Sequence, residues 1–212
     1  MQDITQIQKS FIVLSSGRTG SVFLAFNIAK QFDILPTYLL DSSKFIKDPA
    51  ERIIVHSHYL HIPTDTNEYV RVFSIRKDIV MSAISMSIAS HYKLYHHYQH
   101  QNYLPTEPFI FSNWQKLDER CDYIMRWLTF YSSTLTDQDS VIVYETLMNK
   151  IPTTVTKQVY PNKENIVINY QEMIDYVTEK YAADMLKNAQ IFLDHGNLSD
   201  PIYNMDKDFR LF

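Results

Sequence analysis

The segment that most constrains the fold runs from Phe11 to Ala25. The chain has three glycines in 212 residues, and two of them, Gly17 and Gly20, lie here. An apolar run precedes the two glycines, and an apolar run with helical spacing follows them. This pattern predicts a buried strand, a tight turn and a helix. Glycine in the turn allows positive φ angles and a close approach of the backbone to a ligand.

A turn of this kind favours an anion, because it directs backbone N–H groups toward the N-terminus of a helix. Arg18 adds a guanidinium suited to phosphate or sulfate. The segment is not a Walker A loop, since no lysine follows Gly20. That absence argues against an ordinary ATP or GTP hydrolase. The alternative interpretation is a common strand-to-helix turn in which Arg18 is a surface residue.

Composition excludes several classes of function. The formal net charge is −4, so a broad basic surface for nucleic acid is not expected. The single cysteine, Cys121, excludes an internal disulfide and a cysteine-based zinc site. No apolar run reaches the roughly 18 residues of a membrane span, and residues 1–10 lack a signal-peptide core. We therefore expect a cytoplasmic protein with no membrane span and no nucleic-acid partner.

Short apolar strands alternate with helical patterns along the chain. Strands are expected near residues 11–14, 52–58, 69–75 and 140–144, with a short one at 38–40. Helical patterns cover residues 79–98, 113–135 and 171–193, with a helical turn at 145–149. Such alternation is typical of an α/β fold in which helices cover both faces of a mainly parallel sheet. We expect a single domain over residues 1–212.

Polar residues follow three of these strands. The first strand leads to Ser16–Arg18, the second to His56 and His58, and the third to Arg76. Ligands of parallel α/β folds bind at the carboxyl ends of the strands. We therefore expect these side chains to surround one anionic ligand.

Four segments, in order, resemble the P-loop sulfotransferases, the bacterial nodulation-factor type in particular. Residues 17–21 are similar to the family's 5′-phosphosulfate loop, and residues 56–58 to its Lys-Thr-His strand end. Residues 76–85 are similar to its Arg-Arg-Asp-x-x-x-Gln-Ala-x-Ser pattern, and residues 143–147 to Arg-Tyr-Glu-Asp-Leu. Three departures accompany the likeness: Gly17 replaces a proline, Val22 replaces a threonine, and no Arg-Lys-Gly-x-x-Gly follows near the C-terminus.

The resemblance implies a three-layer α/β/α fold of the P-loop nucleotide-hydrolase-like sulfotransferase type. It implies transfer of a sulfuryl group from 3′-phosphoadenosine-5′-phosphosulfate (PAPS) to a hydroxyl of a carbohydrate or small metabolite, with no metal. His58 would be the catalytic base, and Arg18 would act at the leaving oxygen. Arg76 and Ser85 would hold the 3′-phosphate. The 5′-phosphosulfate would bind the loop residues Gly17, Arg18, Thr19, Gly20, Ser21 and Val22.

Two other functions stay open. One is a small nucleotide kinase, which the missing Gly-Lys-Ser/Thr disfavours. The other is a catalytically inactive relative that binds PAP, the desulfated product, or another nucleotide. Each residue also has a structural interpretation: His58 as a hydrogen-bonded strand-end histidine, Arg76 as the partner of Asp78 in an ion pair, and Glu145 as a hydrogen-bonding residue.

Residues 92–135 form a helical and aromatic segment that we expect to cover the acceptor site. Its aromatic side chains suit stacking on a sugar, although packing on the core or a contact in a homo-oligomer explains them equally well. His96 and His100 have the spacing of two metal ligands on one helix face. No carboxylate or cysteine accompanies them in residues 91–100, so we favour a solvated helix end.

Overall fold

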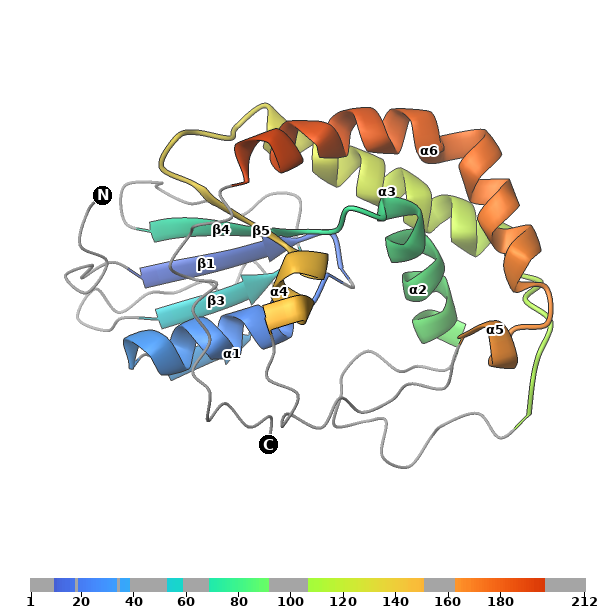
Figure 1. Ribbon diagram of the computed structural model, residues 1–212, viewed down its shortest axis with the longest axis horizontal. Coiled ribbons are helices and arrows are strands. Elements are labelled where there is room, and N and C mark those ends of the chain that lie inside the picture. The colour runs from blue at the N-terminus through green and yellow to red at the C-terminus, as the bar shows by residue number, and fades with distance from the viewer. Residues whose placement is uncertain are drawn as a thin grey trace.

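The computed structural model describes residues 10–17, 19–33, 35–38, 53–58, 69–91, 107–150 and 163–196, and the structural statements below concern these residues. Strands alternate with helices along the chain (Figure 1). The strands are β1 (Ser10–Ser15), β2 (Leu35–Tyr38), β3 (Ile53–Ser57), β4 (Tyr69–Ile75) and β5 (Ser140–Val143). The helices are α1 (Ser21–Phe32), α2 (Ile79–His91), α3 (Trp114–Ser132), α4 (Tyr144–Lys150), α5 (Lys163–Ile166) and α6 (Tyr170–His195).

The five strands form one parallel sheet in the order β2-β3-β1-β4-β5. The central strand, β1, pairs with β3 on one side and with β4 on the other. In this register Leu14 lies opposite Ser57, and Ser15 lies opposite Ser74. Because all pairs are parallel, the carboxyl ends of the strands share one edge of the sheet.

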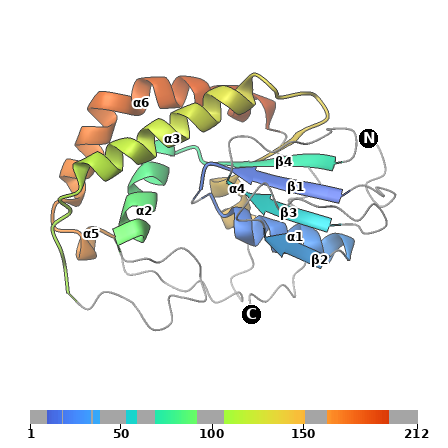
Figure 2. The same cartoon turned by 180° about the vertical axis from the view of Figure 1, so that it is seen from behind.

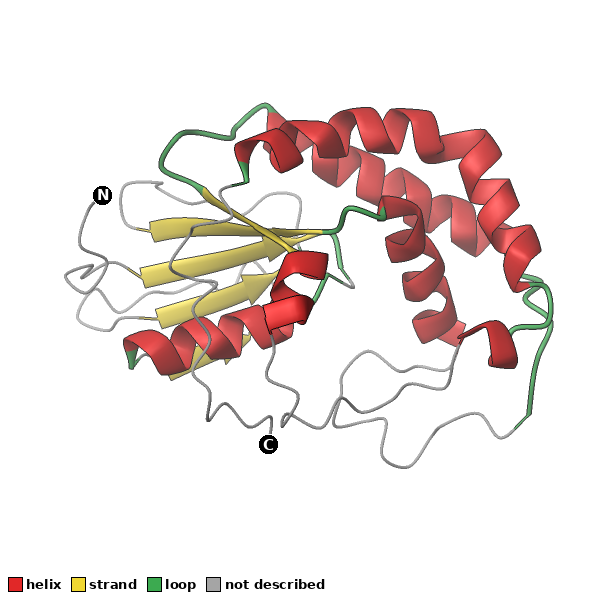
Figure 3. Cartoon of the chain, in the orientation of Figure 1, coloured by secondary structure: helices red, strands yellow, loops and turns green. Residues whose placement is uncertain are grey.

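Helices cover both faces of this sheet, as the sequence predicts (Figures 1 and 3). Alternate residues of β1 serve two separate cores, because successive side chains of a strand point to opposite faces. Phe11 and Val13 pack with α1 and with Leu147 of α4. Ile12 and Leu14 belong to the larger core, which is shared with α2, α3 and α6. The layers are therefore α/β/α.

The boundaries of several elements differ from the sequence prediction. The short strand expected at 38–40 is β2 at Leu35–Tyr38, on the edge of the sheet, where a proline such as Pro36 is tolerated. The helix expected at 79–98 is described as far as His91. Helix α5 was not expected, nor was the parallel bridge between Phe109 and Val167.

The start of α3 has a local cause. Asn113 is its N-cap, and the Asn113 side chain accepts a hydrogen bond of 3.0 Å from the Lys116 N–H. From this cap the helix buries one stripe of apolar residues against the core, Leu117, Cys121, Ile124, Leu128 and Tyr131 among them. The helix expected at 113–135 therefore has its N-cap at the predicted start, but it ends at Ser132, before the predicted end at 135.

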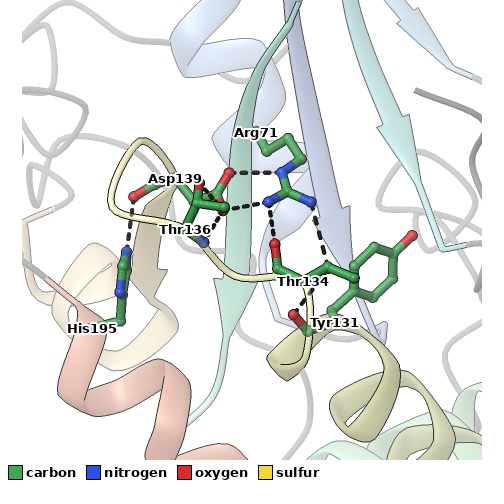
Figure 4. A network of polar contacts seen from close by, with 6 residues as sticks. All are labelled: Arg71, Tyr131, Thr134, Thr136, Asp139 and His195. Carbon is green, nitrogen blue, oxygen red and sulfur yellow. Dashed lines mark hydrogen bonds and ion pairs between the residues drawn. The ribbon is translucent and has the colours of Figure 1, made fainter. Parts of the chain in front are cut away.

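A buried ion pair fixes the turn between α3 and β5 (Figure 4). Arg71 of β4 donates to Asp139 through Nε at 2.7 Å and also through a terminal nitrogen, and the two side chains are 7% and 4% exposed. Arg71 also donates to the Thr134 carbonyl, and the Asp139 carboxylate accepts from Thr136. His195 at the end of α6 donates to the Asp139 carbonyl.

Candidate active site at the carboxyl edge of the sheet

The turn between β1 and α1 requires its two glycines. Gly17 has φ +99° and Gly20 has φ +70°, in the region that residues with a Cβ rarely adopt. A Cβ on Gly17 would lie 3.1 Å from the Met86 sulfur, and one on Gly20 would lie 2.9 Å from the Tyr144 ring. The turn is therefore packed between α2 on one side and the β5–α4 junction on the other.

The start of α1 has the features of an anion site. Gly20 caps the helix without a side-chain hydrogen bond, and the first turn contains no acidic residue. Thr19 is 0% exposed, and its Oγ1 has no hydrogen-bond partner among the described residues. Ser74 of β4 donates to the Thr19 carbonyl at 2.7 Å and so ties the turn to the sheet. Val22 is half-buried in the first turn of α1, and Arg18 lies outside the described residues.

His58 follows β3 directly and bonds to the end of β1. Its Nδ1 lies 3.0 Å from the Ser15 carbonyl oxygen and 2.8 Å from Ser15 Oγ. Ser15 Oγ donates to Ser21 Oγ at 3.0 Å and accepts from the Gly17 N–H at 3.3 Å. The imidazole is thus connected to both sides of the glycine turn through one hydroxyl.

These bonds assign the tautomer of a neutral His58 ring. A carbonyl oxygen only accepts, so Nδ1 carries the proton that is shared with Ser15. Because Ser15 Oγ gives its own hydrogen to Ser21, it also acts as an acceptor toward His58. The lone pair of the neutral imidazole therefore lies on Nε2. A histidine in this form is able to take a proton through Nε2.

Tyr123 of α3 supports the same strand end. Its hydroxyl donates to the His58 carbonyl, which connects the helix layer to the end of β3. Burial raises the pKa of Tyr123 to about 12, so the hydroxyl keeps its proton and stays a donor at neutral pH. The sequence alone did not single out Tyr123.

Arg76 follows β4, on the other side of β1 from His58. Its Nε lies 3.4 Å from Glu145 Oε1, too poorly aligned for a hydrogen bond but within ion-pair distance. The guanidinium also lies over the Tyr144 ring, 4.9 Å from its centroid. The structural interpretation expected an ion pair between Arg76 and Asp78. That expectation is wrong, because Arg76 pairs with Glu145 instead.

Glu145 also holds the start of α2. Its two carboxylate oxygens accept from the Lys77 N–H at 2.9 Å and from the Asp78 N–H at 3.4 Å. The expectation that Glu145 makes structural hydrogen bonds is confirmed. Tyr144, which the sequence reasoning did not assign, lies between Gly20 and Arg76: its ring occupies the space that a Cβ on Gly20 would enter, and the guanidinium lies over it.

The structure therefore brings most of the expected residues to one edge. Gly17 and Gly20 form the β1–α1 turn, and His58 and Arg76 follow the strands on its two sides. Ser85 lies on α2 and is 3% exposed, next to the Met86 whose sulfur crowds Gly17. Three earlier expectations are not covered by the structure. The described part of the chain does not include the side chain of His56, the helix pattern beyond residue 91, or His96 and His100.

Ser15 is the residue that sequence reasoning missed and that the geometry makes central. It lies in the segment that the sequence singled out, and its position two residues before Gly17 was the available signal.

No group of three or more metal-binding side chains occurs within the described ranges. No helix in the described ranges is long and apolar enough to cross a membrane. No protein-family model, curated protein or solved structure matches the chain.

Proposed function

We propose that the protein is a PAPS-dependent sulfotransferase that acts on a hydroxyl of a carbohydrate or small metabolite. The observation that carries the proposal is the position of His58 and Arg76 on the two sides of the β1–α1 turn. The strand order, with the glycine turn after the central strand, suits the P-loop sulfotransferase fold that the sequence resembles.

The turn and the start of α1 bind the 5′-phosphosulfate in this proposal. Backbone N–H groups from Thr19 to Val22 and the Arg18 guanidinium stabilise the charge that develops on the bridging oxygen. Thr19 Oγ1 supports this assignment, because a buried hydroxyl without a described partner is uncommon in folded proteins. A phosphate oxygen at the turn would provide that partner.

His58 acts as the base through Nε2. The acceptor hydroxyl gives its proton to Nε2 while its oxygen forms a bond to sulfur. The bond between sulfur and the bridging oxygen breaks, and its electron pair leaves with PAP. Solvent then takes the proton from His58. The hydrogen bonds that Nδ1 donates to Ser15 hold Nδ1 protonated and keep the lone pair on Nε2 throughout binding.

Arg76 binds the 3′-phosphate together with Ser85 in this proposal. A guanidinium offers several N–H groups, so Arg76 is able to keep Glu145 on one side and bind phosphate with another. The guanidinium lies over the Tyr144 ring, which stabilises its positive charge. Glu145 is thus a positioning residue for Arg76.

Ligand binding tests the donor class before the acceptor is known. PAP and PAPS should raise the unfolding temperature of the protein more than ATP and ADP do. In calorimetry, Arg18→Ala and Arg76→Ala should each weaken PAP binding by about 10- to 100-fold, the usual value of charged hydrogen bonds. A preference for ATP that depends on magnesium would replace the proposal with a nucleotide kinase.

Transfer of sulfate tests the role of His58. With PAPS labelled in the sulfuryl group and a panel of hydroxyl acceptors, His58→Ala should bind PAP normally and lose about two to four powers of ten in rate. An equal loss of PAP affinity in this variant would contradict a role as the base. PAP binding without transfer to any acceptor by the wild type would favour the inactive relative.

A further inference from the structure

Arg120 of α3 has few partners for a guanidinium enclosed between two helices. Its side chain is half-buried, and a terminal nitrogen donates to Ser90 Oγ of α2 at 3.0 Å. Its Nε is buried and has no hydrogen-bond partner in the part of the chain that the structure describes. Among the described residues no carboxylate lies within ion-pair distance of it. A guanidinium with this much unused donor capacity is suited to an anionic ligand.

Two neighbouring acids on α3 are engaged elsewhere. Glu119 bonds to Lys116 at 2.7 Å. Asp118 accepts from Tyr181 at 2.7 Å and from Lys180 at 3.0 Å, on the side of the helix that faces α6. Neither carboxylate bonds to Arg120, so within the described ranges its guanidinium has no carboxylate partner.

Arg120 also lies close to the proposed site. It is three residues before Tyr123, so both side chains leave the same face of α3, about one helical turn apart. The Tyr123 hydroxyl reaches the His58 carbonyl. Figures 1 and 2 show the N-terminal half of α3 extending beyond the ends of the strands, next to α2. Arg120 is therefore about one helical turn along α3 from the tyrosine whose hydroxyl meets the end of β3.

We propose that Arg120 binds an anionic group on the acceptor, a carboxylate or a sulfate ester. This inference rests on the proposed function, because it assigns the substrate class of the same site. Arg120 would hold the anionic group while an acceptor hydroxyl of the same molecule meets Nε2 of His58. The enzyme would then prefer acidic or already sulfated sugars to neutral ones.

The test measures binding of three sugars to the full chain without any donor. Glucose, glucuronate and glucose 6-sulfate differ in charge and in the source of that charge, and saturation-transfer NMR or calorimetry gives their affinities. We expect the wild type to bind at least one anionic sugar more tightly than glucose. Arg120→Gln should abolish that preference, a loss of about 10- to 100-fold. Arg120→Lys should retain part of it, because charge is kept and the planar donor set is lost.

Arg126→Gln is the matched control. Arg126 is an exposed arginine on the same helix, and its Nε donates only to the Asp122 carbonyl of its own helix among the described residues. This variant should change sugar affinity by less than about twofold, as expected for an exposed charge. The unfolding midpoint of each variant shows whether the substitution has lowered the stability of the fold. If Arg120→Gln does not fold, two other results test the inference. They are the preference of the wild type for an anionic sugar and the partial retention of that preference by Arg120→Lys.

Two results would overturn the inference. One is equal wild-type affinity for glucose and both anionic sugars, and the other is an Arg120→Gln variant that folds and keeps the preference. The second result would make Arg120 a structural link between α3 and α2. Failure of the proposed function is seen separately, because PAP binding is measured without sugar. Absence of PAP binding in the wild type would overturn the proposed function, whereas the sugar affinities decide whether Arg120 binds an anionic group.

Discussion

Ser15 and His58 come from two neighbouring strands and are joined at their ends by two contacts. Nδ1 of His58 lies 2.8 Å from Ser15 Oγ and 3.0 Å from the Ser15 carbonyl oxygen. The carbonyl fixes which nitrogen holds the proton, and the hydroxyl connects the ring to Ser21 and Gly17 of the turn. Orientation of the histidine and shape of the turn are therefore coupled through one serine side chain.

Ser15→Ala should separate these two effects. The carbonyl bond remains, so the tautomer should be kept, while loss of the hydroxyl loosens the ring and the turn. We expect a rate loss of about tenfold, in line with one hydrogen bond of roughly 1.5 kcal/mol. Nitrogen-15 NMR of the ring reports the tautomer, and initial rates at several pH values report the activity. A proton on Nε2 of the wild-type neutral ring would contradict the assignment.

Gly20→Ala should destabilise the protein more than Gly17→Ala does. Both positions have positive φ, which costs about 1–2 kcal/mol for a residue with a Cβ. At Gly20 the new Cβ also meets the Tyr144 ring at 2.9 Å, whereas at Gly17 it meets the flexible Met86 side chain at 3.1 Å. Urea unfolding measures the loss of stability in each of the two variants. The reverse order would show that Met86 yields less readily than the tyrosine ring.

Glu145→Ala should weaken PAP binding and destabilise the start of α2. The carboxylate accepts from the Lys77 and Asp78 N–H groups and holds Arg76, and alanine removes all three interactions. We expect a stability loss of about 1–2 kcal/mol, since the site is partly exposed. Glu145→Gln is the control, because it keeps one acceptor oxygen. Calorimetry with PAP and urea unfolding distinguish the two variants, and tighter PAP binding by Glu145→Ala would contradict a positioning role.

The sequence predicted the sheet and the edge where the candidate site lies, because both depend on local patterns. Alternating strand and helix periods gave the α/β class, and two glycines close together marked the turn after β1. The partners of the site residues could not be predicted, since they follow from strand order and register. Nothing local indicates that Ser15 meets His58 or that Glu145, rather than Asp78, pairs with Arg76. The short β2 was misplaced because edge strands carry a weak apolar pattern.

Asp139→Ala should destabilise the fold without affecting PAP binding. The ion pair between Arg71 and Asp139 is almost fully buried, and removal of one partner leaves an uncompensated charge. Such a loss costs about 3–5 kcal/mol. Arg71 lies near the amino end of β4, away from the carboxyl edge. Urea unfolding of Asp139→Ala and of the isosteric Asp139→Asn, with PAP thermal shifts on each, tests both halves of the prediction.

Alkaline pH should weaken the fold through acids of α3 whose pKa burial raises, Cys121 and Tyr123 among them. Burial raises the pKa of Cys121 to about 12 and that of Tyr123 to about 12, so both stay protonated in the folded protein. In the unfolded chain they ionise near pH 8.5 and pH 10, about their ordinary values. The folded state then holds more protons, and its stability is complete below those values and falls as pH rises toward 12.

Urea unfolding between pH 7 and pH 11 measures this loss, and two variants assign it. Each group that is ionised only in the unfolded state adds a slope of about 1.4 kcal/mol per pH unit. Cys121→Ala should start from a lower stability, because it leaves a cavity, yet show a shallower slope above pH 8.5. Tyr123→Phe should show a shallower slope only above pH 10. Unchanged slopes in both variants would mean that these groups ionise as readily in the fold as outside it.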